Sequence, residues 1–170
     1  MPSGSTWSAV ARFFSRAWLS VVSTKTNGHT ASDSVTNPKI VNGINITYNP
    51  IDQPAIICAD RTQINRLFTN LFQNAIEASE NKTVIDIIID LNSNGNKLQI
   101  DFTDHGVGIP AEKQDKIFTP NFTTKSSGTG LGLAMCKSIV EQAHGKIWFE
   151  TQKGQGTTFH VELPKANWSL

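Results

Sequence analysis

The sequence predicts an α/β fold, a two-layer sandwich in which a mixed, largely antiparallel sheet packs against helices. Three features predict it: two pairs of alternating strand-like segments, a long amphipathic helix ahead of the first pair, and a second helix between the pairs. The resulting order is strands, helix, hairpin, loop, helix and hairpin, with no internal repeat. This order favours one layered domain.

The composition is that of an ordinary folded chain. Its 170 residues suffice for one domain with a substantial core, and 38% are hydrophobic and 17% charged. A formal net charge of +1 gives no overall field favouring nucleic acid or an anionic membrane. No apolar run reaches the roughly 18–20 residues that span a bilayer. Cys58 and Cys136 form no CxxC or zinc-ligand pattern, which predicts free thiols and a cytoplasmic location.

Residues 1–38 differ from the rest of the chain. The first 32 contain Arg12, Arg16 and Lys25 but no acidic residue, and their apolar residues recur at roughly helical spacing. A surface-seeking amphipathic helix and an organelle-targeting segment both fit this composition. We favour a third interpretation, an unpacked or non-native leader followed by a flexible linker.

Compact structure is expected over residues 39–164, with residues 165–170 as a tail. Short β-branched runs predict strand structure within residues 39–48, where Asn42-Gly43 interrupts them. A further strand is predicted at residues 55–59.

The strongest helix signal covers residues 61–79. Asp60 can cap this helix, and Gln63 can complete a capping box three residues later. The apolar residues of this segment form one wide stripe: Ile64, Leu67, Phe68, Leu71, Phe72, Ala75 and Ile76. The stripe predicts a helix with one face packed into the core.

Two hairpins follow. In the first, residues 84–91 and 97–103 alternate apolar and polar side chains on either side of Asn94-Gly95, which tolerates the backbone of a tight turn. The second pairs residues 146–150 with 157–164 around a glycine-containing turn. The sequence between the hairpins predicts a helix over residues 131–144 that ends at Gly145.

Two asparagines on the long helix are candidate metal ligands. Asn70 and Asn74 are four residues apart and share one helix face, beside Glu77. Their carboxamide oxygens are hard ligands suited to Mg²⁺, which keeps several waters and bridges phosphates. Two solvated asparagines are the plain alternative, although asparagine is a mediocre helix former.

Two glycine clusters follow the first hairpin. Asp104 opens the first, and with Gly106 and Gly108 giving access its carboxylate can accept a hydrogen bond from an exocyclic amine. A plain aspartate-stabilised turn fits the spacing equally well. The second cluster precedes the helix at 131–144, where backbone N–H groups favour phosphate oxygens, and Lys125 adds a charge nearby. It lacks the GK[ST] ending of a Walker A loop and does not directly follow a strand, as a dinucleotide-binding motif would.

The chain resembles the ATP-binding catalytic domain of sensor histidine kinases in four ordered motifs: NLFQNAIEAS, DHGVGIP, IFTPNFTTKSSGTGLGLAMCKSIVEQAHGKI and GQGTTFHVELP. This family belongs to the superfamily of DNA gyrase, Hsp90 and MutL, and the sequence looks most similar to nitrogen-regulation-type kinases. The resemblance covers roughly residues 39–164. It implies a Bergerat-type sandwich with ATP held between the long helix and a mobile lid, residues 119–129.

The resemblance also implies roles for individual residues. Asn74 would be the principal Mg²⁺ ligand and Asn70 would support it. Asp104 would read the adenine amino group with the help of Thr157. The other implied contacts to adenine or phosphates are Gly106, Gly108, Thr124, Lys125, Gly128, Gly130 and Gly132.

One difference from gyrase-type ATPases bears on the expected reaction. In gyrase-type ATPases a glutamate that activates water stands four residues before the metal-binding asparagine, whereas here that position is Asn70, which cannot act as a base. This favours phosphoryl transfer to a protein, because such transfer depends mainly on positioning and charge neutralisation.

The resemblance bears on three further residues. Phe118 and Phe122 would pack the lid, and His105 stands where the family often has asparagine.

The acceptor of the phosphoryl group is missing. None of the four histidines, His29, His105, His144 and His160, lies in the acceptor motif, and no dimerisation helix pair precedes Lys39. The resemblance therefore implies a partner, a histidine-bearing dimerisation domain supplied in trans or lost, and indirectly a response regulator. A stand-alone ATPase, an anti-sigma-type serine kinase and a truncated nucleotide-binding module without transfer activity remain alternatives.

Overall fold

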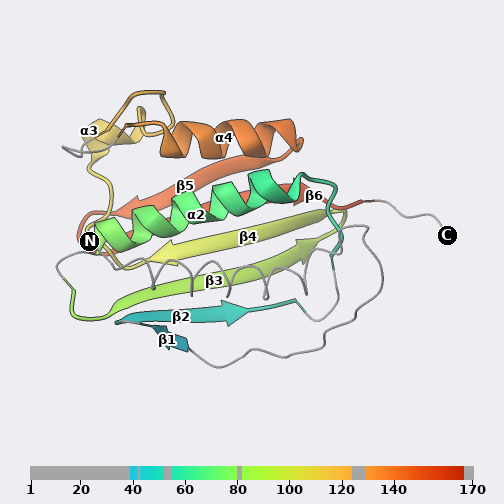
Figure 1. The fold of residues 1–170 in the computed structure, drawn as a ribbon. Coiled ribbons are helices and arrows are strands. Elements are labelled where there is room, and N and C mark those ends of the chain that lie inside the picture. Colours follow the sequence, from blue (N-terminus) through green and yellow to red (C-terminus); the bar gives the residue numbers. More distant parts are fainter. Residues whose placement is uncertain (1–38, 42, 52–54, 80–81, 124–128, 167–170) are drawn as a thin grey trace.

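The computed structural model describes residues 39–41, 43–51, 55–79, 82–123 and 129–166. Its elements in chain order are β1 (Lys39–Val41), β2 (Ile44–Asn49), α2 (Arg61–Ala78), β3 (Ile85–Asn94), β4 (Lys97–Asp104), α3 (Ala111–Gln114), α4 (Gly132–Gln142), β5 (Lys146–Gln152) and β6 (Gly156–Pro164). α2 and α4 cover one face of the sheet (Figure 1). This confirms the predicted two-layer α/β sandwich.

The strands of the described residues form a six-stranded sheet in the order β1-β2-β3-β4-β6-β5. β2 and β3 are parallel, and α2 is the crossover between them. The neighbouring pairs on either side are antiparallel, including the two predicted hairpins β3–β4 and β5–β6. The sheet is therefore mixed and largely antiparallel, as the sequence predicted.

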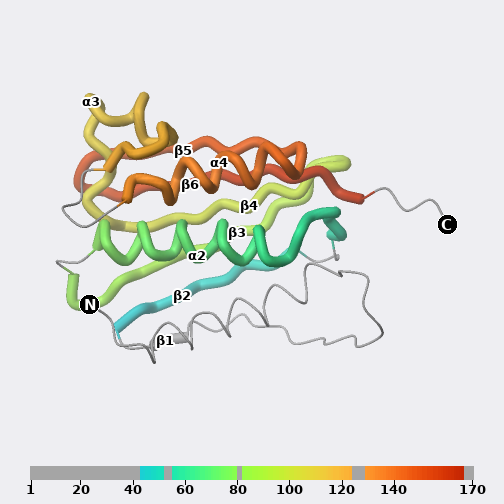
Figure 2. The backbone as a smooth tube through the Cα atoms, turned by 45° about the horizontal axis from the view of Figure 1, so that its top comes forward, coloured from blue at the N-terminus to red at the C-terminus, as the bar shows by residue number. Residues whose placement is uncertain are grey.

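Both helices pack through the faces that their sequences present. The Asp60 carboxylate caps α2 by accepting a hydrogen bond from the backbone N–H of Gln63 at 2.9 Å. Every residue of the predicted apolar stripe on α2 is buried. α4 lies beside α2 on the same face of the sheet, over β5 and β6 (Figure 2). The core thus lies between these two helices and the apolar rows of β2, β3, β4 and β6.

The prediction of a strand at residues 55–59 is wrong. These residues form only an isolated bridge, between Ile57 and Lys165. Ala55 and Ile57 are buried, and this alternation produced the strand-like pattern. The bridge partner lies just beyond β6, and the backbone N–H of Ala166 donates to the carbonyl of Ile56 at 2.7 Å. The pairing is limited to this isolated bridge.

The end of α4 also differs from expectation. The left-handed residue is His144, with φ of 57°, and not Gly145. His144 N–H bonds the Glu141 carbonyl and Gly145 N–H bonds the Val140 carbonyl, which is the Schellman pattern with His144 at C′. Gly145 is needed for space, because a Cβ there would lie 2.3 Å from the carbonyl oxygen of Glu162.

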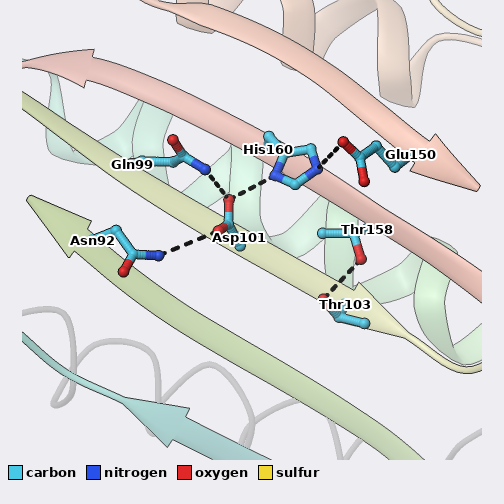
Figure 3. A network of polar contacts seen from close by, with 7 residues as sticks. All are labelled: Asn92, Gln99, Asp101, Thr103, Glu150, Thr158 and His160. Carbon is cyan, nitrogen blue, oxygen red and sulfur yellow. Dashed lines mark hydrogen bonds and ion pairs between the residues drawn. The ribbon is translucent and has the colours of Figure 1, made fainter. Parts of the chain in front are cut away.

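The face of the sheet away from the helices is polar. Along β4 the buried Leu98, Ile100 and Phe102 alternate with Gln99, Asp101 and Thr103, whose side chains lie on the other face (Figure 3). Asp101 accepts hydrogen bonds from Gln99, at 2.8 Å, and from Asn92, at 3.3 Å.

A histidine completes this polar network. Asp101 Oδ1 lies 2.7 Å from His160 Nδ1, which must carry the proton because a carboxylate only accepts. The imidazole stacks on Trp148 with 5.0 Å between ring centroids. Three strands, β3, β4 and β6, are thereby tied through one carboxylate, and β5 is added through the ring stack.

We expect Asp101→Ala to lower the free energy of unfolding by about 1–2 kcal/mol, because three donors lose a shared and largely buried acceptor. Asp90→Ala is the matched control on the same face, since Asp90 accepts one exposed side-chain hydrogen bond, from Asn49. Its expected cost is within about 0.5 kcal/mol. Urea unfolding of both variants measures the difference, and equal costs would contradict the role of the network.

Candidate functional site

Asp104 ends the buried row of β4. The residue is 3% exposed, and its Oδ1 accepts a hydrogen bond from the backbone N–H of Gly106 at 2.8 Å. Thr157 lies opposite it on β6 and is also buried. Burial raises the pKa of Asp104 above its ordinary value, although backbone bonds from Gly106 and Thr157 and the nearby His105 and Lys82 act to lower it. The bond to Gly106 is the aspartate-stabilised turn that the spacing allowed. A carboxylate is also costly to bury, so Asp104 is a candidate functional residue as well.

Residues 105–109, the glycine loop, are held between α2 and the β5–β6 hairpin. On one side the backbone N–H of Val107 donates to the Ala78 carbonyl at 3.0 Å, and a Cβ on Gly106 would lie 2.6 Å from that residue. On the other side a Cβ on Gly108 would lie 2.3 Å from the carbonyl oxygen of Gln152. Gly108 also has φ of 68°, so this backbone requires glycine at both positions.

One face of α2 connects this loop to the start of α4. Asn70, Asn74 and Ala78 are spaced four apart and form a row, the α2 row, that spans about 12 Å along the helix. Ala78 touches Gly106 at one end of the row. At the other end Asn70 faces α4, where its Oδ1 lies 3.6 Å from the position of a Cβ on Gly132. The structure thus brings both glycine clusters to one helix face.

The oxygens on this row have the chemistry that Mg²⁺ requires. Asn70 donates its amide N–H to Met135 Sδ at 3.8 Å, which turns Oδ1 toward Gly132. Asn70 and Asn74 are both partly exposed. Among the described residues no three histidine, cysteine, aspartate or glutamate side chains gather as a metal cluster. Two carboxamide oxygens fit an ion that takes its other ligands from water and phosphates.

The second glycine cluster is only partly described. Gly130 has φ of 68°, and a Cβ on it would lie 2.5 Å from the carbonyl carbon of Asn121 and 2.8 Å from Phe122, so the two ends of the predicted lid meet. Gly132 is the first residue of α4. The predictions for Thr124, Lys125 and Gly128, like those for residues 1–38, lie outside the described residues.

The two predicted lid aromatics are half-buried. Phe118 contacts Phe149 of β5 edge-on, with 6.0 Å between ring centroids. Phe122 packs partly against the core. Both therefore anchor the stem of the segment, while their role toward a ligand stays a prediction.

Sequence reasoning missed Thr151. Its side chain, on β5, is bonded to Ile109 of the glycine loop and to Gly156 and Thr157 at the start of β6. The signal was present, because Thr151 shares the inward row of β5 with Phe149 and pairs with Thr157 across the turn. It could have been found only by pairing the hairpin first.

The two cysteines are free, as predicted, with Cys58 exposed and Cys136 buried. Burial raises the pKa of the Cys136 thiol to about 12, so it is an inert packing group beside α2. In the part of the chain that is described, no helix is both long and apolar enough to cross a membrane.

Comparison with known proteins decides the family. The sequence profile described as "Histidine kinase-, DNA gyrase B-, and HSP90-like ATPase" matches residues 59–167. The chain belongs to this family. Its fold matches the catalytic domain of the histidine kinase ThkA with a TM-score of 0.64 and 39% identity, over 72% of this chain and 80% of that one.

The chain is also similar in sequence to curated proteins that are named as kinases. It is 41% identical over 121 residues to the sensor histidine kinase ZraS of Escherichia coli strain K12, covering 71% of this chain and 26% of ZraS. It is 37% identical over 136 residues to the adaptive-response sensory kinase SasA of Prochlorococcus marinus, covering 75% of this chain and 35% of SasA. The chain thus spans about a quarter to a third of these relatives' length.

These similarities confirm the predicted resemblance: the chain is an ATP-binding catalytic domain of the histidine kinase type. The narrower assignment to nitrogen-regulation-type kinases stays a prediction. The domain boundaries at residues 39 and 164 also stay a prediction.

Proposed function

We propose that this domain binds Mg²⁺-ATP along the α2 row and transfers the γ-phosphoryl group to a histidine of a separate dimerisation domain. A response regulator would then receive the group from that histidine. The observation that carries the proposal is the α2 row itself, which links buried Asp104, by way of Gly106, to Gly132 at the start of α4. The free thiols support the predicted cytoplasmic location.

Different residues would contact the adenine, the phosphates and the metal ion. Asp104 and Thr157 would take the adenine, with the glycine loop shaping that end of the site. The backbone at Gly130 and Gly132 would meet the phosphates at the start of α4. Thr124, Lys125 and Gly128 are predicted to add phosphate contacts. Asn74 and Asn70 would hold Mg²⁺, which supplies neutralisation of phosphate charge when bound.

The transfer itself needs no strong base on this domain. A neutral imidazole nitrogen attacks the γ-phosphorus with its lone pair, the P–N bond forms, the bond to the bridging oxygen breaks, and ADP leaves. The chain's part is to hold the phosphates in line for that attack. Asn70 at the position four before Asn74 supports transfer over hydrolysis, because a carboxamide cannot take a proton from water.

The kinase proposal is tested by mixing the chain with γ-labelled ATP and a separately supplied dimerisation domain that bears the acceptor histidine. Acid-labile, base-stable label on that domain is the expected result. Label on a serine of a partner would favour the anti-sigma-type serine kinase, and release of phosphate without a partner would favour the ATPase. No label despite proven ATP binding would leave a nucleotide-binding module.

The metal assignment has its own prediction. Asn74→Ala is expected to weaken Mg²⁺-dependent ATP binding by roughly 10- to 100-fold while leaving the weaker binding measured in EDTA unchanged. Gln73→Ala is the matched control, because Gln73 is exposed next to Asn74 and bonds only Glu77 among the side chains of α2. Isothermal titration calorimetry with and without Mg²⁺ gives both affinities. Equal losses with and without the ion would remove Asn74 from the metal site.

A further inference from the structure

The Thr151 hydroxyl makes three contacts beside the proposed adenine end of the site. Its Oγ1 accepts a hydrogen bond from the backbone N–H of Ile109 at 2.9 Å. It also lies 3.0 Å from the carbonyl oxygen of Gly156 and 3.0 Å from Oγ1 of Thr157. One hydroxyl therefore joins the end of the glycine loop to the start of β6.

Only one arrangement of protons satisfies all three contacts. A backbone N–H only donates and a carbonyl oxygen only accepts, so the single proton of Thr151 must point to Gly156. The remaining contact is a hydrogen bond only if Thr157 donates its own proton to Thr151. Thr157 Oγ1 then has lone pairs alone for anything else that it meets.

We propose that Thr151 is a positioning residue that sets the base specificity of the site by holding the Thr157 hydroxyl as an acceptor. Together with the Asp104 carboxylate, the Thr157 hydroxyl would then present only acceptors to the base. Such a pair attracts the amino group at position 6 of adenine and repels a carbonyl oxygen at that position. The inference rests on the proposed function, because it takes Asp104 and Thr157 as the residues that read the base.

Inosine triphosphate is the probe that isolates this effect. It has the sugar and phosphates of ATP but carries a carbonyl oxygen at position 6, with a proton on the neighbouring ring nitrogen. The ratio of the two dissociation constants therefore reports on the base alone. We expect the wild-type chain to bind ATP roughly 100-fold more tightly than inosine triphosphate, both with Mg²⁺.

The test replaces the hydroxyl in two ways and restores it in one. Thr151→Val and Thr151→Ala remove it, so the Thr157 proton becomes free to turn toward a carbonyl oxygen, and the preference for ATP should fall by roughly five- to tenfold. Thr151→Ser keeps the hydroxyl and should keep the preference. Thr158→Val is the matched control, since it breaks a similar threonine pair, with Thr103, on the opposite face of the sheet.

The outcomes separate this inference from the proposed function. Equal loss of affinity for both nucleotides in Thr151→Val and Thr151→Ala would mean that Thr151 only supports the loop, and would overturn the inference while the function stands. A changed preference in Thr151→Ser would overturn it as well. A wild-type chain without preference for ATP would overturn the inference together with the assignment of Asp104 and Thr157 to the base, whereas the kinase function is tested separately by label on the acceptor domain. Circular dichroism and thermal unfolding establish that each variant is folded.

Discussion

Asp104→Asn is expected to lower the affinity for ATP by roughly 100-fold or more. Asp104 is 3% exposed, and its Oδ1 is held by the backbone N–H of Gly106. If the asparagine oxygen keeps that bond, its amide nitrogen would present a donor to the donor on adenine. Loss of a charged hydrogen bond and an unpaired buried group each cost on the order of 1.5–3 kcal/mol. Isothermal titration calorimetry measures the change.

The matched control is Asp86→Asn, on the polar face of β3. Asp86 is exposed and accepts one hydrogen bond, from Asn45 at 2.8 Å, so its substitution should leave ATP affinity unchanged. Unaltered binding by Asp104→Asn would remove the base-reading residue from the site. An equal loss in both variants would point to general electrostatics rather than to this pocket.

The pH dependence of nucleotide preference in the wild-type chain gives a second test of Asp104. Burial raises its pKa in the folded chain, so the acceptor is lost at a higher pH than for an ordinary carboxyl group, near 4. The preference for ATP over inosine triphosphate should therefore fall as the pH is lowered through that raised value. His105 and Lys82 face this group, and the shared phosphates cancel in the ratio.

Lowering the pH has the opposite effect on the stability of the fold, which it should increase. A raised folded-state pKa means that the folded chain binds the proton more tightly than the unfolded chain. The contribution of Asp104 to stability is fully present below about pH 4 and is lost as the pH rises through the raised value. Relative to Asp104→Asn, the wild-type chain should gain stability on acidification. The carboxylate is thus held for binding at the expense of folding.

Gly156→Ala is expected to lower the free energy of unfolding by roughly 3–5 kcal/mol. Its φ is 118°, and a Cβ would lie 2.0 Å from the carbonyl oxygen of Asp104 and 2.8 Å from the Cα of His105. Since these are backbone atoms, no side chain can move aside. The substitution must push β6 away from β4 at the position of Asp104, and ATP binding should fail with it.

Gly154→Ala is the control that separates the cost of backbone strain from the cost of the steric clash at Gly156. Gly154 has φ of 79°, in the same left-handed region, but a Cβ there would meet nothing within 4 Å. Its expected cost is about 1–2 kcal/mol, the penalty of that backbone conformation alone. Guanidinium unfolding of the two variants compares them directly. Costs that agree within error would show that the approach of β6 to β4 is not tight.

Much of the fold followed from local pattern. The Asp60 cap and the α2 stripe needed only helical spacing, and β3 and β4 needed only alternation around a turn. The strand expected at residues 55–59 failed because its partner is set by tertiary pairing with Lys165. Left-handed His144 was missed because glycine is the usual residue at that place.

The candidate site was less accessible to sequence reasoning. The residues of the four motifs were found one by one, but their convergence depends on the close contacts of Gly106 with Ala78 and of Gly108 with Gln152. No local pattern encodes these approaches, because glycine also serves ordinary turns. Thr151 shows the same limit, since its importance comes from Ile109, which is 42 residues away in sequence.

The most direct test of the proposed site is a structure of the chain with Mg²⁺ and a non-hydrolysable ATP analogue. We expect the adenine amino group within hydrogen-bond distance of the Asp104 carboxylate, with Mg²⁺ on the carboxamide oxygen of Asn74. A nucleotide bound with its base away from Asp104, or an ion held without Asn74, would contradict the proposed site.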